Sequence, residues 1–178
     1  PGALYLINSE DKSWKPLQPR LPEDNFQMEQ VYKDCPVPLK KDQLSPGGIN
    51  MRLGNNGRHT LYVVNFGGRA SIEVFNMNMD AQEPTITWVG CVVMPEKTSP
   101  NSVVPLPDGG LAVTSFADPT KDLKEQLLSG EKTGKILEWF SETGWKLVPG
   151  SELRGNNGIE ISPDGQWYYV AEWAGQTF

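Results

Sequence analysis

The chain has little of the residues on which several common activities depend. Histidine occurs once and cysteine twice in 178 residues. The spacing of Cys35 and Cys91 does not match a structural zinc site. The sequence also lacks a Gly-x-Ser-x-Gly elbow, a His-Glu-x-x-His motif and a phosphate-binding loop. Nothing therefore favours a serine hydrolase of the elbow type, a zinc protease or a nucleotide hydrolase.

Positive charge and long apolar runs are scarce as well. There are 16 Lys and Arg against 22 Asp and Glu, a net charge of −6 without a basic cluster, which argues against a nucleic-acid partner. No apolar run approaches the roughly 18 residues that span a membrane, so we expect no membrane partner. The chain starts at Pro1 without a signal-like region, which indicates a removed leader or an internal piece of a longer protein.

The two cysteines leave the compartment open. Cys35 and Cys91 fit one disulfide in an exported protein and equally fit buried free thiols. Both interpretations stand on the sequence alone, and the localisation is unknown.

Turn residues and short apolar runs are abundant. The chain has 18 Gly and 15 Pro, and 38% of its residues are apolar. This composition is enough for a core and, with short β-rich runs, predicts an all-β protein with many turns.

Three segments of the chain are variants of one another. Aligning Gly47, Asn101 and Asn157 gives offsets of 54 and 56 residues, and each copy continues into a turn and a β-rich run. A near-constant period of this size indicates a repeat architecture, and strand–turn–strand units of this length are typical of propeller blades.

The strands can be counted within this period. We predict them at 4–7, 14–17, 49–53, 61–65, 72–75, 86–91, 103–106, 111–116, 136–140, 145–148, 159–162 and 167–172. They form a half blade (1–46), two whole blades (47–100 and 101–156) and a half blade (157–178). Three blades cannot close a ring, so we expect a single partial β-propeller domain that either lacks its other half or associates with itself.

Two segments depart from this pattern. Asp118 to Gly130 is predicted as a short helix with Leu123, Leu127 and Leu128 on one face, inserted in a loop as either a lid or a packing element. The segment 16–46, rich in Pro and charge, is predicted as a long connection between blades.

Asn101 and Asn157 are the candidate metal ligands. Each stands just before the first strand of a blade, which lines the channel of a propeller, so their amide oxygens would share one spot. Such oxygens suit Ca²⁺, whereas an asparagine beside glycine is also an ordinary turn former.

A resemblance to a known family rests on these residues and their neighbours. The chain resembles the senescence-marker-protein (SMP-30)/gluconolactonase superfamily, in particular its paraoxonase-like bacterial members. The resemblance covers nearly the whole chain, in order. The matching segments are 34–36, 45–49, 62–65, 88–91, 100–103, 157–159, 162–165 and 168–172.

The resemblance implies a six-bladed propeller with a catalytic Ca²⁺ that hydrolyses lactones or esters. It assigns Asn101 and Asn157 as two calcium ligands and places the remaining carboxylate ligands outside this chain. Paraoxonases carry His where this chain has Gly47 and Phe66, and an Asp is common where Ser102 stands. The only histidine, His59, lies beside a hairpin turn far from the channel end, so no catalytic residue or general base is assigned.

The second strand of each blade ends in an aromatic residue: Phe66, Phe116 and Trp173. These ends share the face of Asn101 and Asn157, so the rings fit a wall for a small lactone or ester substrate, and they equally fit packing between blades.

Two hypotheses of different classes follow. The first is an incomplete chain of a calcium-dependent lactonase or arylesterase-like hydrolase of the gluconolactonase/paraoxonase type. The alternative is a non-catalytic propeller that binds a small ligand or protein partner, with the asparagines serving only as turn formers.

Overall fold

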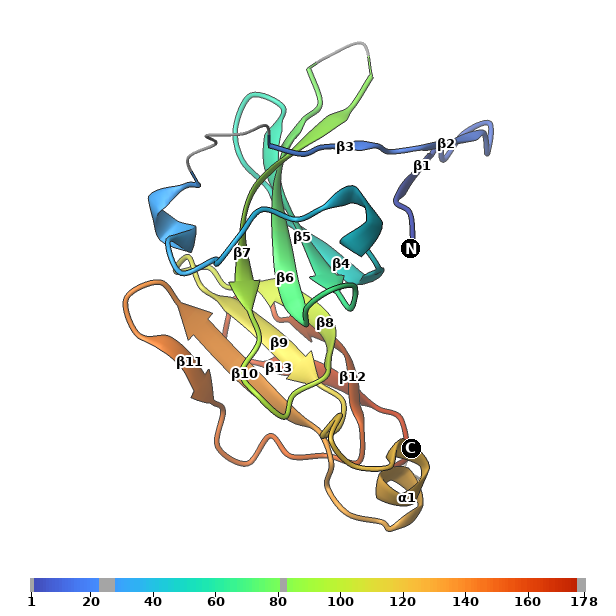
Figure 1. Cartoon of the computed structure of the whole chain (residues 1–178), viewed down its shortest axis with the longest axis vertical. Helices are drawn as coiled ribbons and strands as arrows, with labels where there is room; N and C mark the ends of the chain where they lie inside the picture. The colour runs from blue at the N-terminus through green and yellow to red at the C-terminus, as the bar shows by residue number, and fades with distance from the viewer. Residues whose placement is uncertain (1, 23–27, 81–82, 176–178) are drawn as a thin grey trace. The chain divides into compact units, whose positions relative to one another are not determined.

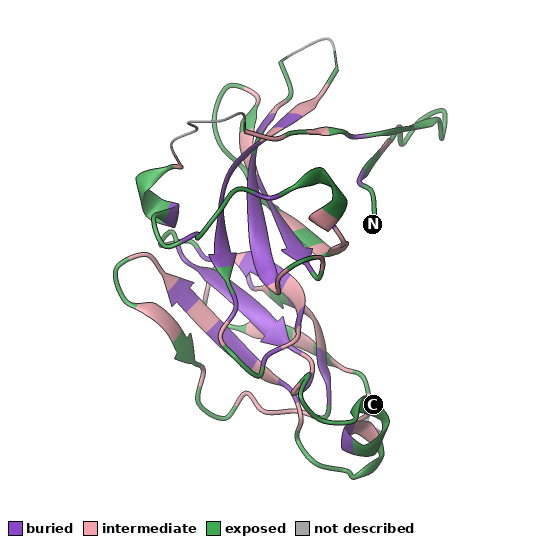
Figure 2. Ribbon diagram, in the orientation of Figure 1, coloured by how far each residue is buried: buried purple, intermediate pink, exposed green. Residues whose placement is uncertain are grey.

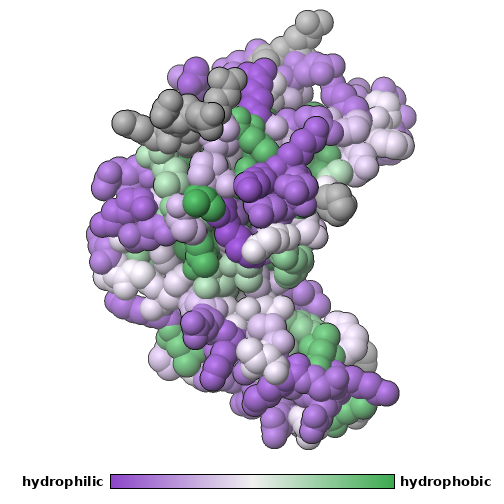
Figure 3. Space-filling view, in the orientation of Figure 1, coloured by the Kyte–Doolittle hydropathy of each residue, from purple (hydrophilic) through white to green (hydrophobic). Residues whose placement is uncertain are grey.

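The computed structural model describes residues 2–22, 28–80 and 83–175. Strands dominate these residues and helix is scarce, so the all-β class is confirmed. The chain divides into two compact units, unit 1 (Pro1–Pro46 and Met51–Val93) and unit 2 (Gly47–Asn50 and Met94–Phe178). No helix in the described part of the chain has the length and apolar character needed to cross a membrane. On the face shown in Figure 3, hydrophilic residues predominate and hydrophobic ones form separate patches.

A sheet with the strand order β3-β7-β6-β5-β4 forms the centre of unit 1 (Figure 1). Its strands are β3 (Pro19–Arg20), β4 (Pro46–Arg52), β5 (Arg58–Asn65), β6 (Ser71–Asn78) and β7 (Thr85–Val93). In the turn from β4 to β5, Asn56 and Gly57 have φ angles of 53° and 63°. An Asn-Gly pair adopts positive φ at both positions readily, which explains a tight hairpin here. Figure 2 shows β5, β6 and β7 as largely buried.

The first 46 residues hold more structure than a hairpin and a connection. β1 (Tyr5–Ile7) and β2 (Trp14–Pro16) form the predicted antiparallel pair. The segment that follows contains β3 and the 3-10 helices η1 (Gln30–Tyr32) and η2 (Lys41–Gln43). β3 pairs parallel to the outer strand β7, so the prediction of a plain connection was wrong at this point. Two residues are too few to show the alternation by which a strand is recognised.

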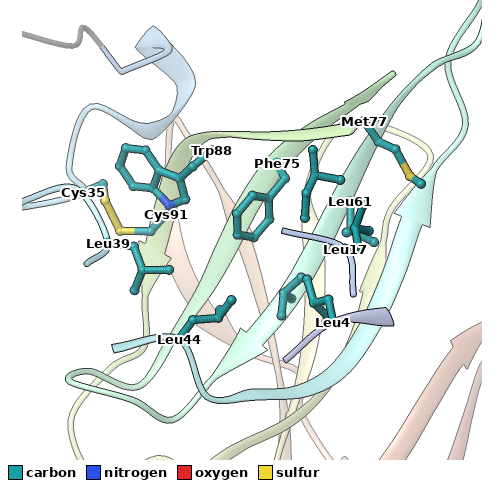
Figure 4. Close-up of a cluster of buried hydrophobic side chains, with 12 residues drawn as sticks. Leu4, Leu17, Cys35, Leu39, Leu44, Leu61, Phe75, Met77, Trp88 and Cys91 are labelled. Atoms are coloured by element: carbon teal, nitrogen blue, oxygen red, sulfur yellow. A yellow bond between two sulfur atoms is a disulfide. The ribbon is translucent and has the colours of Figure 1, made fainter. Parts of the chain in front are cut away.

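Cys35 and Cys91 form a disulfide with an S–S distance of 2.00 Å. The two cysteines are therefore paired and not free thiols, and the bond fastens the segment before η2 to β7. Figure 4 shows the bond at one side of a hydrophobic core cluster of unit 1, with Phe75 between Trp88 and Leu61. Leu4 and Leu17, which flank the first hairpin, belong to the same cluster.

Unit 1 also buries a charged pair. The carboxylate of Glu73, fully excluded from solvent, accepts hydrogen bonds from Nε and Nη2 of Arg69 at 2.9 and 3.1 Å. The Ser71 hydroxyl and the Trp88 indole N–H donate to it as well, each at 2.7 Å. Each carboxylate oxygen of Glu73 therefore accepts two hydrogen bonds. These bonds offset the cost of burying the charge.

Unit 2 contains a four-stranded antiparallel sheet and a separate hairpin. The sheet has the order β11-β10-β9-β8, built from β8 (Pro100–Pro105), β9 (Leu111–Ser115), β10 (Lys135–Phe140) and β11 (Gly144–Leu147). The hairpin consists of β12 (Asn156–Ile161) and β13 (Tyr168–Glu172). Ile159 of the hairpin joins Val104, Ala112 and Ile136 of the sheet in one hydrophobic cluster.

The inserted helix is shorter than predicted. α1 spans Leu123–Leu128, and its N-terminus is capped by Asp122, whose side chain accepts a hydrogen bond from the Glu125 amide at 2.7 Å. Leu123 and Leu128 are exposed, so the predicted apolar face was wrong; the buried residue is Gln126. Its side-chain amide bonds both the N–H and the C=O of Asp118, at 3.0 and 2.9 Å, and replaces apolar packing as the anchor of the helix.

The internal repeat recurs in the hydrogen bonds. The N–H after the second strand bonds the C=O before the first strand in every copy: Phe66 to Ser45 (3.1 Å), Phe116 to Ser99 (2.7 Å) and Trp173 to Gly155 (3.0 Å). Ser45, Ser99 and Gly155 stand 54 and 56 residues apart, which are the predicted offsets. The repeat is therefore structural as well as sequential.

Candidate functional site

Asn101 and Asn157 occupy matching places in unit 2. Both lie inside a strand, in β8 and β12, and not just before the first strand as predicted. Each sits where the register shifts: Pro100 pairs with Ser115 while Ser102 pairs with Thr114, and the ladder slips likewise between Asn156 and Ile159. An extra residue in one strand marks a β-bulge, a device that re-aims a side chain.

The two bulges are joined through one buried hydroxyl. Oγ1 of Thr114 accepts a hydrogen bond from the Ser102 amide at 3.1 Å and donates to the Asn157 carbonyl. β8 and β12 are in contact with each other. The backbones that carry Asn101 and Asn157 are thus neighbours within unit 2, two hydrogen bonds apart.

Residues 47–50, which begin the first copy of the repeat and belong to unit 2, lie at the same place. A Cβ built on Gly48 would stand 2.6 Å from the Asn101 carbonyl oxygen and 2.9 Å from Cα of Ser102. No side chain fits such a gap, so glycine is required for the first strand of that copy to lie against β8. Gly47, which aligns with the two asparagines, therefore contributes backbone but no amide oxygen.

The side chains of Asn101 and Asn157 differ from other asparagines of the chain. Asn65 and Asn156 are fully buried, and their amides bond loop backbone: Asn156 accepts from Leu153 N at 3.1 Å and donates to Ser151 O at 2.9 Å. The amides of Asn101 and Asn157 are half-buried and make no hydrogen bond with any residue that the structure describes. A turn-forming asparagine bonds the backbone with its side-chain amide, as Asn65 does. The amides of Asn101 and Asn157 make no such bond with the described residues, so they are available to a ligand.

Two amide oxygens supply only part of a calcium shell. Ca²⁺ takes six to eight oxygens, several of them carboxylate. Among residues 2–22, 28–80 and 83–175, no group of three or more His, Cys, Asp or Glu is arranged to hold a metal ion. The donor chemistry of Asn101 and Asn157 suits calcium, and its negative charge would have to come from elsewhere.

The acidic groups near the strand ends have other partners. Glu172, at the end of β13, accepts a hydrogen bond from the Arg154 amide at 2.8 Å. Asp118, at the start of the inserted segment, accepts from the hydroxyl and the amide of Thr120, and these bonds lower the pKa of its carboxyl group. Both carboxylates are thus engaged in ordering loops.

The structure brings two of the three predicted aromatic residues together. The rings of Phe116 and Trp173 meet edge to face with centroids 5.9 Å apart. Phe116 also packs on Gly155, whose added Cβ would stand 3.0 Å from the ring. Of this pair, Trp173 is the ring that remains exposed to solvent. Phe66 takes the corresponding position in unit 1 and is exposed.

Sequence reasoning missed Thr114 and a polar residue in each copy. The residue before each aromatic accepts a hydrogen bond from the backbone entering the first strand: Asn65 from Ser45 (2.7 Å), Ser115 from Ser99 (3.1 Å) and Glu172 from Arg154 (2.8 Å). The polar–aromatic pairs at 65–66, 115–116 and 172–173 are visible in the sequence and could have revealed this role. Thr114 has no polar counterpart in the other copies, so no such signal exists for it.

His59 is half-buried in β5, and its Nδ1 accepts a hydrogen bond from the Gly54 amide at 3.1 Å. Its ring therefore closes the hairpin turn between β4 and β5.

Comparisons with known proteins assign the chain to no family. No protein-family model matches the chain. No curated protein matches it either.

Proposed function

We propose that the chain is part of a calcium-dependent hydrolase of lactones or esters, built as a β-propeller, with Asn101 and Asn157 as two of the calcium ligands. The observation that carries the proposal is that Asn101 and Asn157 occupy equivalent positions in their strands. The two amides lie at equivalent bulges of neighbouring first strands, and neither makes a hydrogen bond with a residue that the structure describes.

Unit 2 supports the propeller arrangement. Its four-stranded sheet follows the chain order, as a blade does, and the first strand of the next copy contacts its first strand. Repeated sheets whose first strands adjoin are the basic relationship of a propeller, where those strands surround the channel. Gly48 also approaches the backbone of Asn101 and Ser102 closely, so residues 47–50 of the first copy lie against β8 as well.

The residues of this chain have defined tasks in the proposed site. Asn101 and Asn157 offer neutral oxygens to the ion, and Thr114 fixes the spacing between the bulges that carry them. A bound calcium ion supplies Lewis acidity toward the carbonyl oxygen of a lactone or ester. Trp173, exposed beside Phe116, offers an apolar surface to the substrate's ring or chain.

Asn157→Ala in the protein that carries the full ligand set tests the proposal. No hydrogen bond within the described residues is lost, so the fold should survive while calcium affinity and hydrolysis fall together. Asn101→Ala should behave in the same way. Calorimetry with CaCl₂ and a chromogenic lactone assay measure the two effects.

Asn156→Ala is the matched control, because it removes a neighbouring asparagine with a purely structural task. It should lower the melting temperature more than Asn157→Ala does. Undiminished calcium binding and activity in Asn157→Ala would refute the proposed site. Calcium binding without turnover of any lactone or ester would favour the non-catalytic alternative.

A further inference from the structure

Unit 1 contains a polar pocket of about 460 Å³ on its sheet. Residues of β3, β5, β6 and β7 line the pocket, and it shares no residue with the candidate site, whose asparagines belong to unit 2. Small-molecule sites have volumes in this range, whereas a bare ion needs far less room. The pocket is thus large enough for a ligand with several polar groups.

The strand register places the lining side chains in two adjacent rows on one face of the sheet. Each row crosses neighbouring strands through directly paired residues, whose side chains point to the same side. The first row is Arg58–Asn78–Thr85, and the second is Thr60–Asn76–Thr87–Arg20. These polar groups are therefore spaced by strands and not by a loop.

This face changes from apolar to polar between two successive pairs of β5 and β6. Tyr62 and Val74 form one pair and are almost fully buried. Thr60 and Asn76 form the next pair on the same face, where Thr60 is half-buried and Asn76 exposed. The polar rows are thus accessible to a ligand from solvent.

The arginine and threonine side chains of the two rows have unused hydrogen-bonding capacity. The hydroxyl groups of Thr60, Thr85 and Thr87 make no hydrogen bond with a residue that the structure describes. The guanidinium groups of Arg20 and Arg58 form no ion pair or hydrogen bond within the described residues either. All five side chains are therefore available to a bound molecule.

The two asparagines of the rows are oriented by their neighbours. Nδ2 of Asn76 donates a hydrogen bond to Oε1 of Glu29 at 3.1 Å, and Oδ1 of Asn78 accepts one from the Asp80 amide at 2.9 Å. Each asparagine thus keeps one amide atom, the oxygen of Asn76 and the nitrogen of Asn78, without a partner among the described residues. The middle of the pocket therefore offers both a hydrogen-bond acceptor and a donor.

Arg20 and Arg58 are the charged residues among the described ones that line the pocket. The acidic residues next to the rows, Glu29 and Asp80, are not part of the lining. Arg58 on β5 and Arg20 on β3 are three strand spacings apart, or about 14 Å. A guanidinium group matches the geometry of a carboxylate or a phosphate, so both sides of the pocket suit an acid group.

We propose that this pocket binds a small hydroxylated organic anion, whose acid group is held by the arginines and whose hydroxyl groups bond the threonines and asparagines between them. The acid group is a carboxylate or a phosphate ester. No aromatic ring is among the described residues that line the pocket, so recognition relies on charge and hydrogen bonds and not on stacking. The inference does not depend on calcium or on hydrolysis.

Calorimetry on the complete protein tests the proposal with malate, glycerol phosphate and sorbitol as probes. The buffer is calcium-free, so that no anion binds through the proposed calcium ion. We expect binding of at least one of the two anions and none of sorbitol, which has hydroxyl groups but no charge. The anion that binds more tightly identifies the acid group. Binding of neither anion, or equal binding of sorbitol, overturns the proposal and leaves the proposed calcium site unaffected.

Arg20→Gln and Arg58→Gln should each weaken binding of the anion at least about tenfold, because each removes a charged hydrogen-bond donor. Neither change removes a side-chain bond within the described structure, so the melting temperature should stay that of the wild type. Arg154→Gln is the matched control, since it makes the same change of charge in unit 2 and should leave the affinity unchanged. Equal weakening in all three variants would mean a non-specific effect of charge and overturn the assignment to this pocket.

Thr87→Val tests the role of the hydroxyl groups. It removes one hydroxyl at nearly constant side-chain volume and should weaken binding of the hydroxylated anion more than that of its analogue without hydroxyl groups, succinate for malate or inorganic phosphate for glycerol phosphate. Equal weakening of both would overturn the proposed contact between the threonine and the ligand's hydroxyl groups.

Discussion

The Thr114 hydroxyl donates a hydrogen bond to the carbonyl oxygen of Asn157, across two strands that belong to different copies of the repeat. The Thr114 hydroxyl oxygen also accepts a hydrogen bond from the Ser102 amide, so a single buried side chain connects the two bulges. The geometry of the candidate site therefore depends on a residue that would not itself touch a ligand.

Thr114→Val should lower the free energy of unfolding by about 1–3 kcal/mol, because it leaves the Ser102 N–H and the Asn157 C=O without this partner at nearly constant side-chain volume. Denaturant unfolding measures the loss. Amide hydrogen exchange should show faster exchange at Ser102 in particular. Thr114→Ser keeps the hydroxyl and should restore protection of that amide; equal protection in wild type and Thr114→Val would contradict the role of the hydroxyl.

Substitution by alanine should reduce the stability of the protein at Asn156 but hardly at all at its neighbour Asn157. Asn156→Ala removes two hydrogen bonds of a fully buried amide and should cost about 2 kcal/mol. Asn157→Ala removes no hydrogen bond within the described structure and should change the stability by less than about 0.5 kcal/mol. Chemical denaturation of both variants gives the comparison, and a larger loss in Asn157→Ala would indicate a structural task for that residue.

Arg69→Met should be strongly destabilising, by about 3–5 kcal/mol, because it leaves the buried carboxylate of Glu73 without its cation. Replacing both residues, as Arg69→Met with Glu73→Gln, should cost less than the single change. A double-mutant cycle measured by denaturation checks this order. Additive effects would show that the two side chains do not interact in solution.

Replacing both Cys35 and Cys91 by serine should lower the free energy of unfolding by on the order of 4 kcal/mol. The bond joins residues 56 positions apart and so restricts a long loop of the unfolded chain. Thermal unfolding with and without reductant offers an independent measurement. An unchanged midpoint on reduction would mean that the segment 35–44 is held to β7 by its packing alone.

The repeat was the part of the fold that the sequence predicted best. Every strand expected in the repeated segments coincides with an observed strand, because alternation and Asp-Gly or Asn-Gly turns are local signals. β3 and the true extent of α1 were missed, since β3 is two residues long and α1 is anchored by the polar side chain of Gln126.

The candidate site was predictable only in outline. The positions of Asn101 and Asn157 followed from the repeat, whereas their bulges and the Thr114 bridge arise from contacts between copies that no local pattern encodes. The pairing of Cys35 with Cys91 likewise needed the spatial approach of the connection to β7.

The insertion that carries α1 leaves β9 after Ser115 and returns at Lys135, and these two residues are cross-strand partners. In the first sheet the corresponding partners, Asn65 and Ser71, are joined by a loop of only five residues. Both loops thus span the same short gap, and loop-closure entropy rises only slowly with length. This junction is a place where the chain can gain or lose residues over evolutionary time, or exchange one loop for the other in the laboratory, without altering the strands on either side.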